Sequence, residues 1–190
     1  MEQLLQSIEK SVSDKNWLSA LFMAICLPDI CASIEDKVMG NGARYRDWFN
    51  RYPKKLYNAE NLLQYMEETR TPENLSRSTP SQIDFYRNKE SFAHFTAEQC
   101  WALRNACLHQ GKDEARLKKF VITFPDHRGY SHLCEFNGVM QLDAAALSLD
   151  LVKYVRIWMK DVENDSVIQQ KLNSMINVRD YQLDFWSEGK

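Results

Sequence analysis

The sequence contains little glycine and none of the glycine-rich loops that hold phosphate groups. Six glycines occur among 190 residues, and no Gly-x-x-x-x-Gly-Lys segment is present, which excludes a P-loop nucleotidase. The Gly-x-Ser-x-Gly turn of the α/β-hydrolases and the Asp-rich loops that bind calcium are missing as well. Any chemistry in this chain therefore comes from a different arrangement of side chains.

The cysteines and histidines lack the spacing of metal ligands. Neither Cys-x2-Cys nor His-x3-His occurs, so the sequence predicts no metal site, and it gives no sign of a cofactor. The cysteine count is odd, and most of these residues fall inside apolar helical runs, which favours buried, reduced thiols over disulfides. The cysteines are Cys26, Cys31, Cys100, Cys107 and Cys134.

Long apolar runs and excess positive charge are also absent. No stretch of about eighteen uninterrupted apolar residues is present, and the first residues, Met-Glu-Gln-Leu-Leu-Gln-Ser, have neither a basic region nor an apolar signal core. We therefore expect a cytoplasmic protein without a membrane partner. The net charge of -2 and a pI near 6.1 exclude a nucleic-acid coat that depends on bulk positive charge, so any contact with RNA is local.

What is present is a chain suited to one mainly α-helical domain over residues 1–190. Its 44% hydrophobic content is ample for a core. The periodicity changes after residue 111, where alternating residues and the Asn137-Gly138 turn predict a small antiparallel β-hairpin or meander at about 118–142. Helices are expected at 2–12, 17–35, 43–52, 58–68, 97–110, 144–161 and about 166–177, and strands at 120–124, 130–136 and 139–142.

Residues 17–35 are apolar on nearly every side, which places this helix in the middle of a bundle or at a dimer interface. Pro28 should kink it, because proline lacks a backbone donor and clashes with the preceding turn. Asp29 and Glu35 are the polar exceptions. One interpretation makes Asp29 part of the kink and Glu35 an exposed end, and the other has one of these carboxylates orienting His109 or Arg104 across the bundle.

The helix at 43–52 and the residues after it are locally basic. Arg44, Arg46, Arg51, Lys54 and Lys55 stand against a single acid, and aromatic residues are interleaved with them. Basic groups for phosphates and aromatic faces for bases are the components of a groove for single-stranded RNA. The alternative is an aromatic core face with an ordinary solvated basic face opposite it.

Residues 69–95 are polar and contain Pro72 and Pro80, which predicts an irregular connection. Its two interpretations are a lid or substrate guide and simple wrapping over the surface. His94 within it is expected to be structural, and His127 and His132 in the predicted β segment are expected to be exposed or paired.

The helix at 97–110 carries the densest set of chemically useful side chains. Thr96 and Gln99 have the spacing of a capping box, and Gly111 suits the left-handed position that ends a helix. Asn105 and His109 are four residues apart and share a face, while the long side chain of Arg104 reaches the same turn. A permanent cation suits a phosphate, and an imidazole suits proton transfer at neutral pH.

The segment Arg104-Asn-Ala-Cys-Leu-His109 resembles the Arg-x4-His motif of the HEPN family, the higher eukaryote and prokaryote nucleotide-binding domains. The apolar helix followed by the basic aromatic one is also similar to stretches in HEPN proteins of phage defence. The resemblance implies a helical bundle that dimerises with two motifs facing each other. A strand insertion departs from the simplest bundle of the family, and Gly111 stands where some toxins of the family have a modifiable Tyr.

This resemblance implies two functions. The first is a metal-independent endoribonuclease of a toxin or phage-defence type, a symmetric homodimer that forms a 2′,3′-cyclic phosphate, with an antitoxin or defence-system component as a further partner. His109 would move the proton, Arg104 would hold the phosphate and Asn105 would orient either group. The second is a catalytically silent module that binds a nucleotide or a partner through the same residues.

Overall fold

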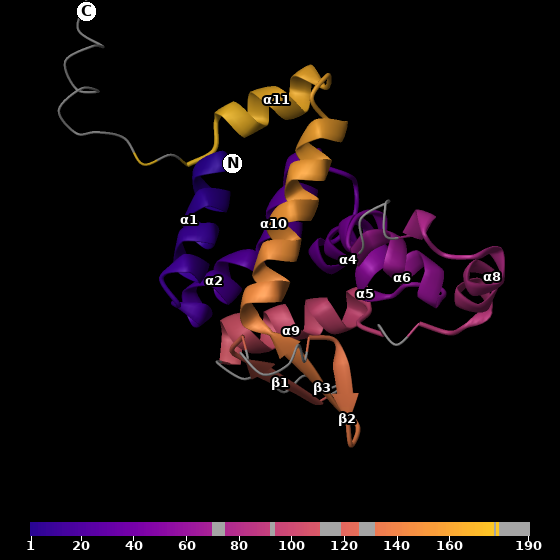
Figure 1. The fold of residues 1–190 in the computed structure, drawn as a ribbon. Helices are drawn as coiled ribbons and strands as arrows, with labels where there is room; N and C mark the ends of the chain where they lie inside the picture. Colours follow the sequence, from indigo (N-terminus) through magenta and orange to yellow (C-terminus); the bar gives the residue numbers. More distant parts are fainter. Residues whose placement is uncertain (70–74, 92–93, 111–118, 126–131, 177, 179–190) are drawn as a thin grey trace, which may run out of the picture.

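The protein, seen here in a computed structural model, is mainly helical with a small three-stranded sheet at one end (Figure 1). The structure describes residues 1–190 apart from 70–74, 92–93, 111–118, 126–131, 177 and 179–190. In chain order the elements are α1 (Glu2–Ser13), α2 (Trp17–Ala24), α3 (Leu27–Glu35), α4 (Asn41–Arg51), α5 (Lys54–Tyr57), α6 (Leu62–Thr69), α8 (Pro80–Asn88), α9 (Ala97–Gln110), β1 (Lys119–Thr123), β2 (Cys134–Phe136), β3 (Val139–Asp143), α10 (Ala144–Asp161) and α11 (Ser166–Asn173).

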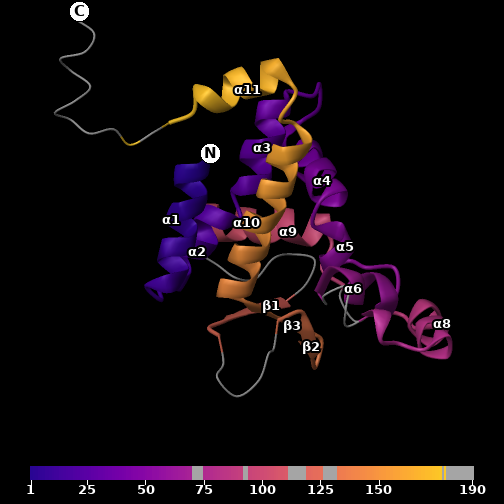
Figure 2. The same cartoon turned by 45° about the horizontal axis from the view of Figure 1, so that its top comes forward.

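Helix α10 is the central element of the bundle. It packs against α1, α2 and α3, while α4 packs on both α3 and α9. Two views that differ by 45° show α1 and α2 on one flank of α10 and α4 to α8 on the other (Figures 1 and 2). The largest fully buried side chains include Trp48, Trp158, Tyr45, Tyr57 and Phe49, so aromatic rings fill much of the interior.

The apolar run at 17–35 forms two helices instead of one kinked helix. Helix α2 ends at Ala24, and α3 begins at Leu27 with Pro28 in its first turn. Proline fits the first turn because a backbone N–H has no partner within the helix at that position. One helix therefore ends before Pro28, and the next begins with Pro28 in its first turn. By length and composition this run could cross a membrane, but half of it is buried inside the fold, as in many core helices.

The sheet differs in topology from the predicted meander. β2 and β3 form the expected antiparallel hairpin, but β3 is the central strand and β1 pairs with it in parallel, giving the order β1-β3-β2. The turn at Asn137 and Gly138 is present, and both residues have positive φ, as the Asn-Gly signal requires. Strand β2 is shorter than predicted because it begins only at Cys134.

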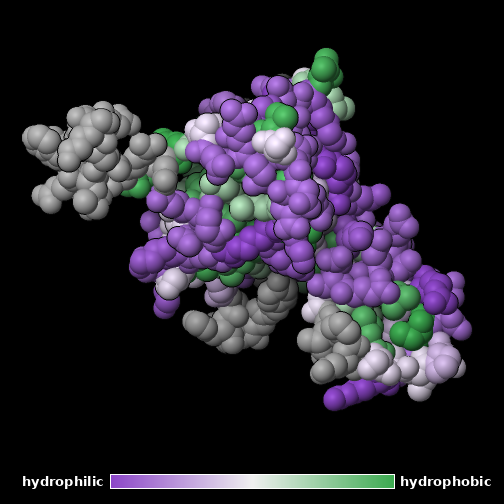
Figure 3. Space-filling view, turned by 90° about the horizontal axis from the view of Figure 1, so that it is seen from above, coloured by the Kyte–Doolittle hydropathy of each residue, from purple (hydrophilic) through white to green (hydrophobic). Residues whose placement is uncertain are grey.

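The polar connection contains a helix that the sequence analysis missed. Residues 80–88 form α8, whose Thr79 and Gln82 make a reciprocal capping box with Pro80 in the first turn. None of its residues is buried, so it had no apolar stripe to reveal it. Viewed from above, the surface is mostly hydrophilic, with hydrophobic side chains gathered over the end of the molecule that carries α6 and α8 (Figure 3).

Helices with strong caps match their predicted bounds. Helix α9 spans 97–110 and α10 spans 144–161, and Asp143 accepts hydrogen bonds from Ala145 N and Ala146 N at the start of α10. Weaker ends were misplaced: α6 begins at Leu62 instead of residue 58, and α11 ends at Asn173. From the sequence we expect Tyr181, Phe185 and Trp186 near the C-terminus to pack on the body or on a second chain, and these three residues lie outside the described part of the structure.

Candidate functional site on helix α9

The start of α9 is fixed by its capping box. Gln99 N donates to Thr96 Oγ1 over 3.3 Å, and Thr96 N donates to Gln99 Oε1 over 2.8 Å. Cys100, Leu103 and Cys107 are buried against the core, so the helix cannot rotate without exposing that face. The cap and the buried face together determine where the polar residues of the last turns lie. Gly111, the predicted end signal, lies outside the described residues.

Arg104 is held on several sides at once. Its Nη2 donates to Asp29 Oδ2 over 2.8 Å, its Nη1 donates to Asn105 Oδ1 over 3.0 Å, and its guanidinium lies 5.1 Å from the centre of the Trp101 ring. The side chain is 17% exposed. The buried Nε has no hydrogen-bond partner among the described residues, so at least one donor of this guanidinium is unused within the described part of the chain.

His109 joins this group from the last turn of α9. Its Nε2 lies 3.4 Å from Arg104 Nη1, and the residue is exposed. If Nη1 donates, Nε2 is an acceptor and its lone pair points toward the guanidinium. Arg104, Asn105 and His109, which the sequence placed on one helix end, therefore do converge within a single chain.

Asp29 and Glu35 have different surroundings. Asp29, in the first turn of α3, orients Arg104, in agreement with the second of the two interpretations for that residue. Glu35 is not an exposed end, since its side chain is 8% exposed and accepts two hydrogen bonds from Arg51 and one from Trp158 Nε1. It contacts neither Arg104 nor His109 and serves to join α3, α4 and α10.

The three predicted RNA-binding arginines of α4 are not equivalent. Arg51 is committed to Glu35 and also contacts Asp47 over 3.1 Å. Arg46 pairs with Glu98 over 3.1 Å. Arg44 donates to Asn41 Oδ1 and pairs with no carboxylate among the described residues, which leaves its charge available to a ligand.

A hollow lies beside Arg44 and Asp29, and Arg104, Asn105 and His109 are not among the residues that line it. Its volume is about 350 Å³, and Asp29, Ser33, Asn41 and Arg44 line it together with apolar residues of α3. Asp29 therefore accepts a hydrogen bond from Arg104 through Oδ2 and also lines this hollow. An anion in the hollow would be within reach of Arg44, and Asp29, which is paired with Arg104, lies beside it.

Two supporting residues were not singled out from the sequence. Tyr45 packs on Trp101 at 5.1 Å between ring centres, and its hydroxyl lies 3.1 Å from Cys100 Sγ. Gly42 lies close to the Trp101 ring, because a Cβ added there would be 3.1 Å from two of its atoms. Trp101 is thus wedged between α4 and Arg104. The aromatic content of both helices was visible in the sequence, but their contact was not.

A second polar cluster lies where Tyr57 of α5 and His132 meet Asp150 of α10. Asp143 N donates to His132 Nδ1, His132 Nε2 lies 3.1 Å from the Tyr57 hydroxyl, and that hydroxyl donates to Asp150 Oδ2 over 2.9 Å. Burial lowers the pKa of His132 to about 4 and raises the pKa of Asp150 to about 6. The sequence predicted His132 to be either exposed or paired, and it is paired. It is neutral at pH 7. His127 lies outside the described residues.

Neither Cys100 nor Cys26 is a nucleophile, and the described residues contain no cluster of metal ligands. Burial raises the pKa of Cys100 to about 12, and burial also raises the pKa of Cys26, which is close to Arg104 and Asp29. Both thiols are protonated at neutral pH and poor nucleophiles. In the part of the chain that the structure describes, no three His, Cys, Asp or Glu side chains gather as metal ligands.

The site is thus an arginine fixed by a carboxylate, an amide and an indole, with an exposed imidazole in contact with it. Comparisons of the chain with protein families, with curated proteins and with solved structures found no match.

Proposed function

We propose that this protein is a metal-independent endoribonuclease of a toxin or phage-defence type, acting as a symmetric homodimer in the cytoplasm. The observation that carries the proposal is the meeting of Arg104, Asn105 and His109 beside Asp29, with His109 exposed. A fixed cation next to an accessible imidazole is what cleavage of RNA by its own 2′-hydroxyl requires. The substrate is a single-stranded RNA that enters through the hollow beside Arg44.

In the proposed reaction, His109 accepts the proton of a ribose 2′-hydroxyl. The 2′-oxygen attacks the adjacent phosphorus, the bond from phosphorus to the 5′-oxygen breaks, and that oxygen leaves with a proton. The products are a 2′,3′-cyclic phosphate and a 5′-hydroxyl end. Arg104 stabilises the extra negative charge on the phosphorane, and Asn105 orients Arg104 through their hydrogen bond. Since one chain carries one such histidine, the second proton transfer falls to His109 of the other chain.

One observation favours a second function. Arg104 is already paired with Asp29, and only 17% of its side chain is exposed. A phosphate would have to share the guanidinium with that carboxylate, which weakens transition-state stabilisation. A catalytically silent module that binds a nucleotide or a partner, for instance an antitoxin, through Arg44 and the hollow is consistent with this arrangement.

The decisive variant is His109→Ala in a cleavage assay with a panel of single-stranded RNAs, each with and without EDTA. We expect the wild type to cleave in EDTA and to leave cyclic phosphate ends, and the variant to lose about 10²-fold to 10⁴-fold in rate, as removal of a proton-transfer group does. His94→Ala is the matched control, because His94 is another exposed histidine of the described chain. This variant should cleave RNA at the wild-type rate.

Equal cleavage by the wild type and the His109→Ala variant would contradict the ribonuclease proposal. The absence of any cleavage, together with saturable binding of nucleotides that an Arg44→Ala substitution abolishes, would instead establish the silent module. Loss of cleavage in EDTA would show that a metal ion takes part.

A further inference from the structure

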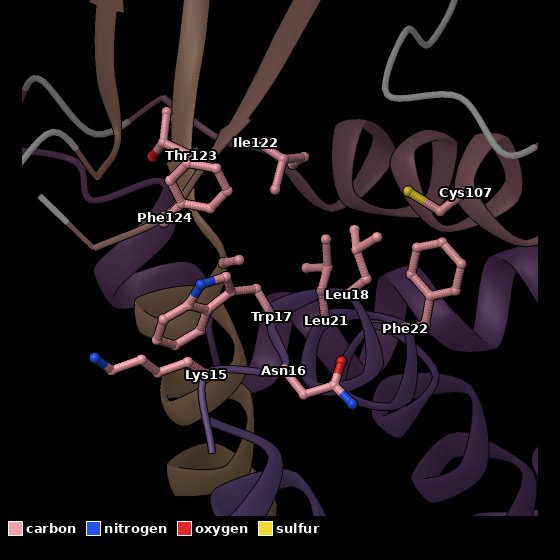
Figure 4. A pocket seen from close by; sticks show the side chains of 11 residues that line it. Lys15, Asn16, Trp17, Leu18, Leu21, Phe22, Cys107, Ile122, Thr123 and Phe124 are labelled. Atoms are coloured by element: carbon pink, nitrogen blue, oxygen red, sulfur yellow. The ribbon is translucent and has the colours of Figure 1, made fainter. Parts of the chain in front are cut away.

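A cavity of about 680 Å³ lies between α2 and β1, apart from the Arg104 group (Figure 4). Small-molecule sites in proteins commonly have volumes of about 300–1,000 Å³ and mostly apolar walls. The walls here are Leu18, Leu21 and Phe22 of α2 together with Ile122 and Phe124. None of the residues that line it belongs to the proposed ribonuclease site.

The cavity remains open although its walls are strongly apolar. Leu18 is 64% exposed and Phe124 is 72% exposed, and both line the space. Large apolar side chains that gather around a concave surface and stay in contact with water mark a binding site more often than chance exposure does. Because each wall belongs to a regular element or directly follows one, the shape exists before any ligand arrives.

Three polar residues line this space. They are Lys15 and Asn16, from the turn between α1 and α2, and Thr123, from the end of β1. Figure 4 shows Lys15 at the same end as Trp17 and Phe124, with Phe22 and Cys107 at the opposite end. The cavity therefore has its positive charge at one end only.

The positive charge of Lys15 is not used by the described residues. Lys15 forms no ion pair with a described residue, whereas the neighbouring Lys10 is paired with Asp14 over 2.6 Å. The hydroxyl oxygen of Thr123 is buried and has no hydrogen-bond partner among the described residues, so it is closed to a ligand in the cavity. An unpaired positive charge beside an apolar cavity is complementary to a carboxylate.

We propose that this cavity binds a small anionic amphiphile, a carboxylate carried on an aliphatic or aromatic body. The carboxylate lies beside Lys15, and the body extends past Phe124 to Leu18 and Phe22. This site is independent of the proposed ribonuclease activity, so either can fail without the other.

The test is isothermal titration of the full chain with octanoate, and with octylammonium as a probe of the same length and opposite charge. We expect saturable octanoate binding with a Kd on the order of 0.1–1 mM, as suits a ligand of this size, and weaker binding of octylammonium. Lys15→Glu should weaken octanoate binding about fivefold, the value of one exposed ion pair, and should bring octylammonium to at least equal affinity. Lys160→Glu is the charge control.

Substitutions in the apolar wall provide an independent check. Leu18 and Phe124 are exposed, so Leu18→Ser and Phe124→Ser should fold normally and weaken octanoate binding by about tenfold each, since both remove apolar contact with the body. Phe85→Ser, an exposed phenylalanine of α8, should bind octanoate as the wild type does. No saturable binding of octanoate, equal binding of both probes by the wild type, or unchanged binding in the Lys15→Glu variant would each overturn the proposal.

Discussion

Arg104 illustrates how a single side chain can be both part of the structure and available to a ligand. Its bond to Asp29 ties α9 to α3, and its contact with Trp101 ties it to the ring that packs on α4. These contacts fix the guanidinium in one position, which reduces the entropy lost when a phosphate binds. The same contacts also hold a negative charge within 2.8 Å of it, so any anion competes with Asp29.

Asp150 is the residue whose ionisation should affect stability most directly. Burial raises the pKa of Asp150 to about 6 from an ordinary 3.8, against the opposing hydrogen bond from Tyr57 and the charge of Lys153. The folded state therefore favours the protonated acid, and this carboxyl group lowers the free energy of unfolding as the pH rises from about 4 through 6. His132 changes in the opposite sense, because the pKa of His132 is lowered to about 4 by burial.

We predict that Asp150→Asn stabilises the protein at pH 7.5 by about 3 kcal/mol, the value of a pKa shift of this size, and has little effect at pH 4. Asparagine retains an oxygen that can accept from the Tyr57 hydroxyl but never becomes charged. His132 titrates in both proteins, so its contribution cancels in the difference. Urea unfolding of both proteins across this pH range measures the effect, and a constant difference at every pH would show that ionisation of Asp150 is not its cause.

The sequence predicted contacts between candidate site residues of the same helix but did not decide the contacts between residues of different helices. The turns of α9 bring Asn105 and His109 to one face, and the reach of the Arg104 side chain is a property of that residue. The partners of Asp29, Glu35 and Arg51 depend instead on how α3, α4 and α9 cross. A run of basic residues therefore indicated a charged face correctly, but it could not reveal that Arg51 is used up by Glu35.

Helices and strands were predictable where the chain itself holds the signal for their ends. Capping by Thr96 and Asp143 fixed α9 and α10. Helix α8 has the same kind of signal at Thr79, but its exposed polar faces gave no apolar period to draw attention to it. The parallel pairing of β1 with β3 had no local signal at all, because it depends on contacts between residues twenty positions apart.

Gly42 of α4 lies against the Trp101 ring of α9, since an added Cβ would be 3.1 Å from two ring atoms and from Arg46 Nη1. We predict that Gly42→Ala slows the proposed RNA cleavage by about tenfold, because a Cβ 3.1 Å from the ring displaces the indole that supports Arg104, and small displacements of catalytic groups are costly. The alanine should also contribute less than the roughly 1 kcal/mol of stability expected for a Gly→Ala change in an open helix position.

A double-mutant cycle separates this steric effect from any other. Trp101→Phe provides a smaller ring, so Gly42→Ala should cost little additional activity in that background and should recover its stabilising effect. Additive losses in the two single variants and the double variant would mean that Gly42 and Trp101 are not coupled, and the steric explanation of the Gly42→Ala effect would then be rejected.

For the molecule as a whole, the main question is how many chains form one site. Arg104 and His109 meet within one chain, so the cation and one proton carrier need no partner. A reaction that both removes a proton from the 2′-oxygen and delivers one to the 5′-oxygen uses two proton transfers, and a two-fold axis near the end of α9 would supply the second imidazole.

Mixed dimers of the wild type and the His109→Ala variant measure this directly. If both histidines act in one shared site, activity should fall with the square of the wild-type fraction after subunits have exchanged, because only dimers with two intact chains cleave. If each chain acts alone, activity should fall in proportion to that fraction. Mixing with an inactive chain that cannot exchange, obtained by cross-linking the variant dimer beforehand, should give the proportional line in either case. A monomeric wild type in light scattering, with full cleavage activity, would rule out the shared site and leave His109 to perform both transfers in turn.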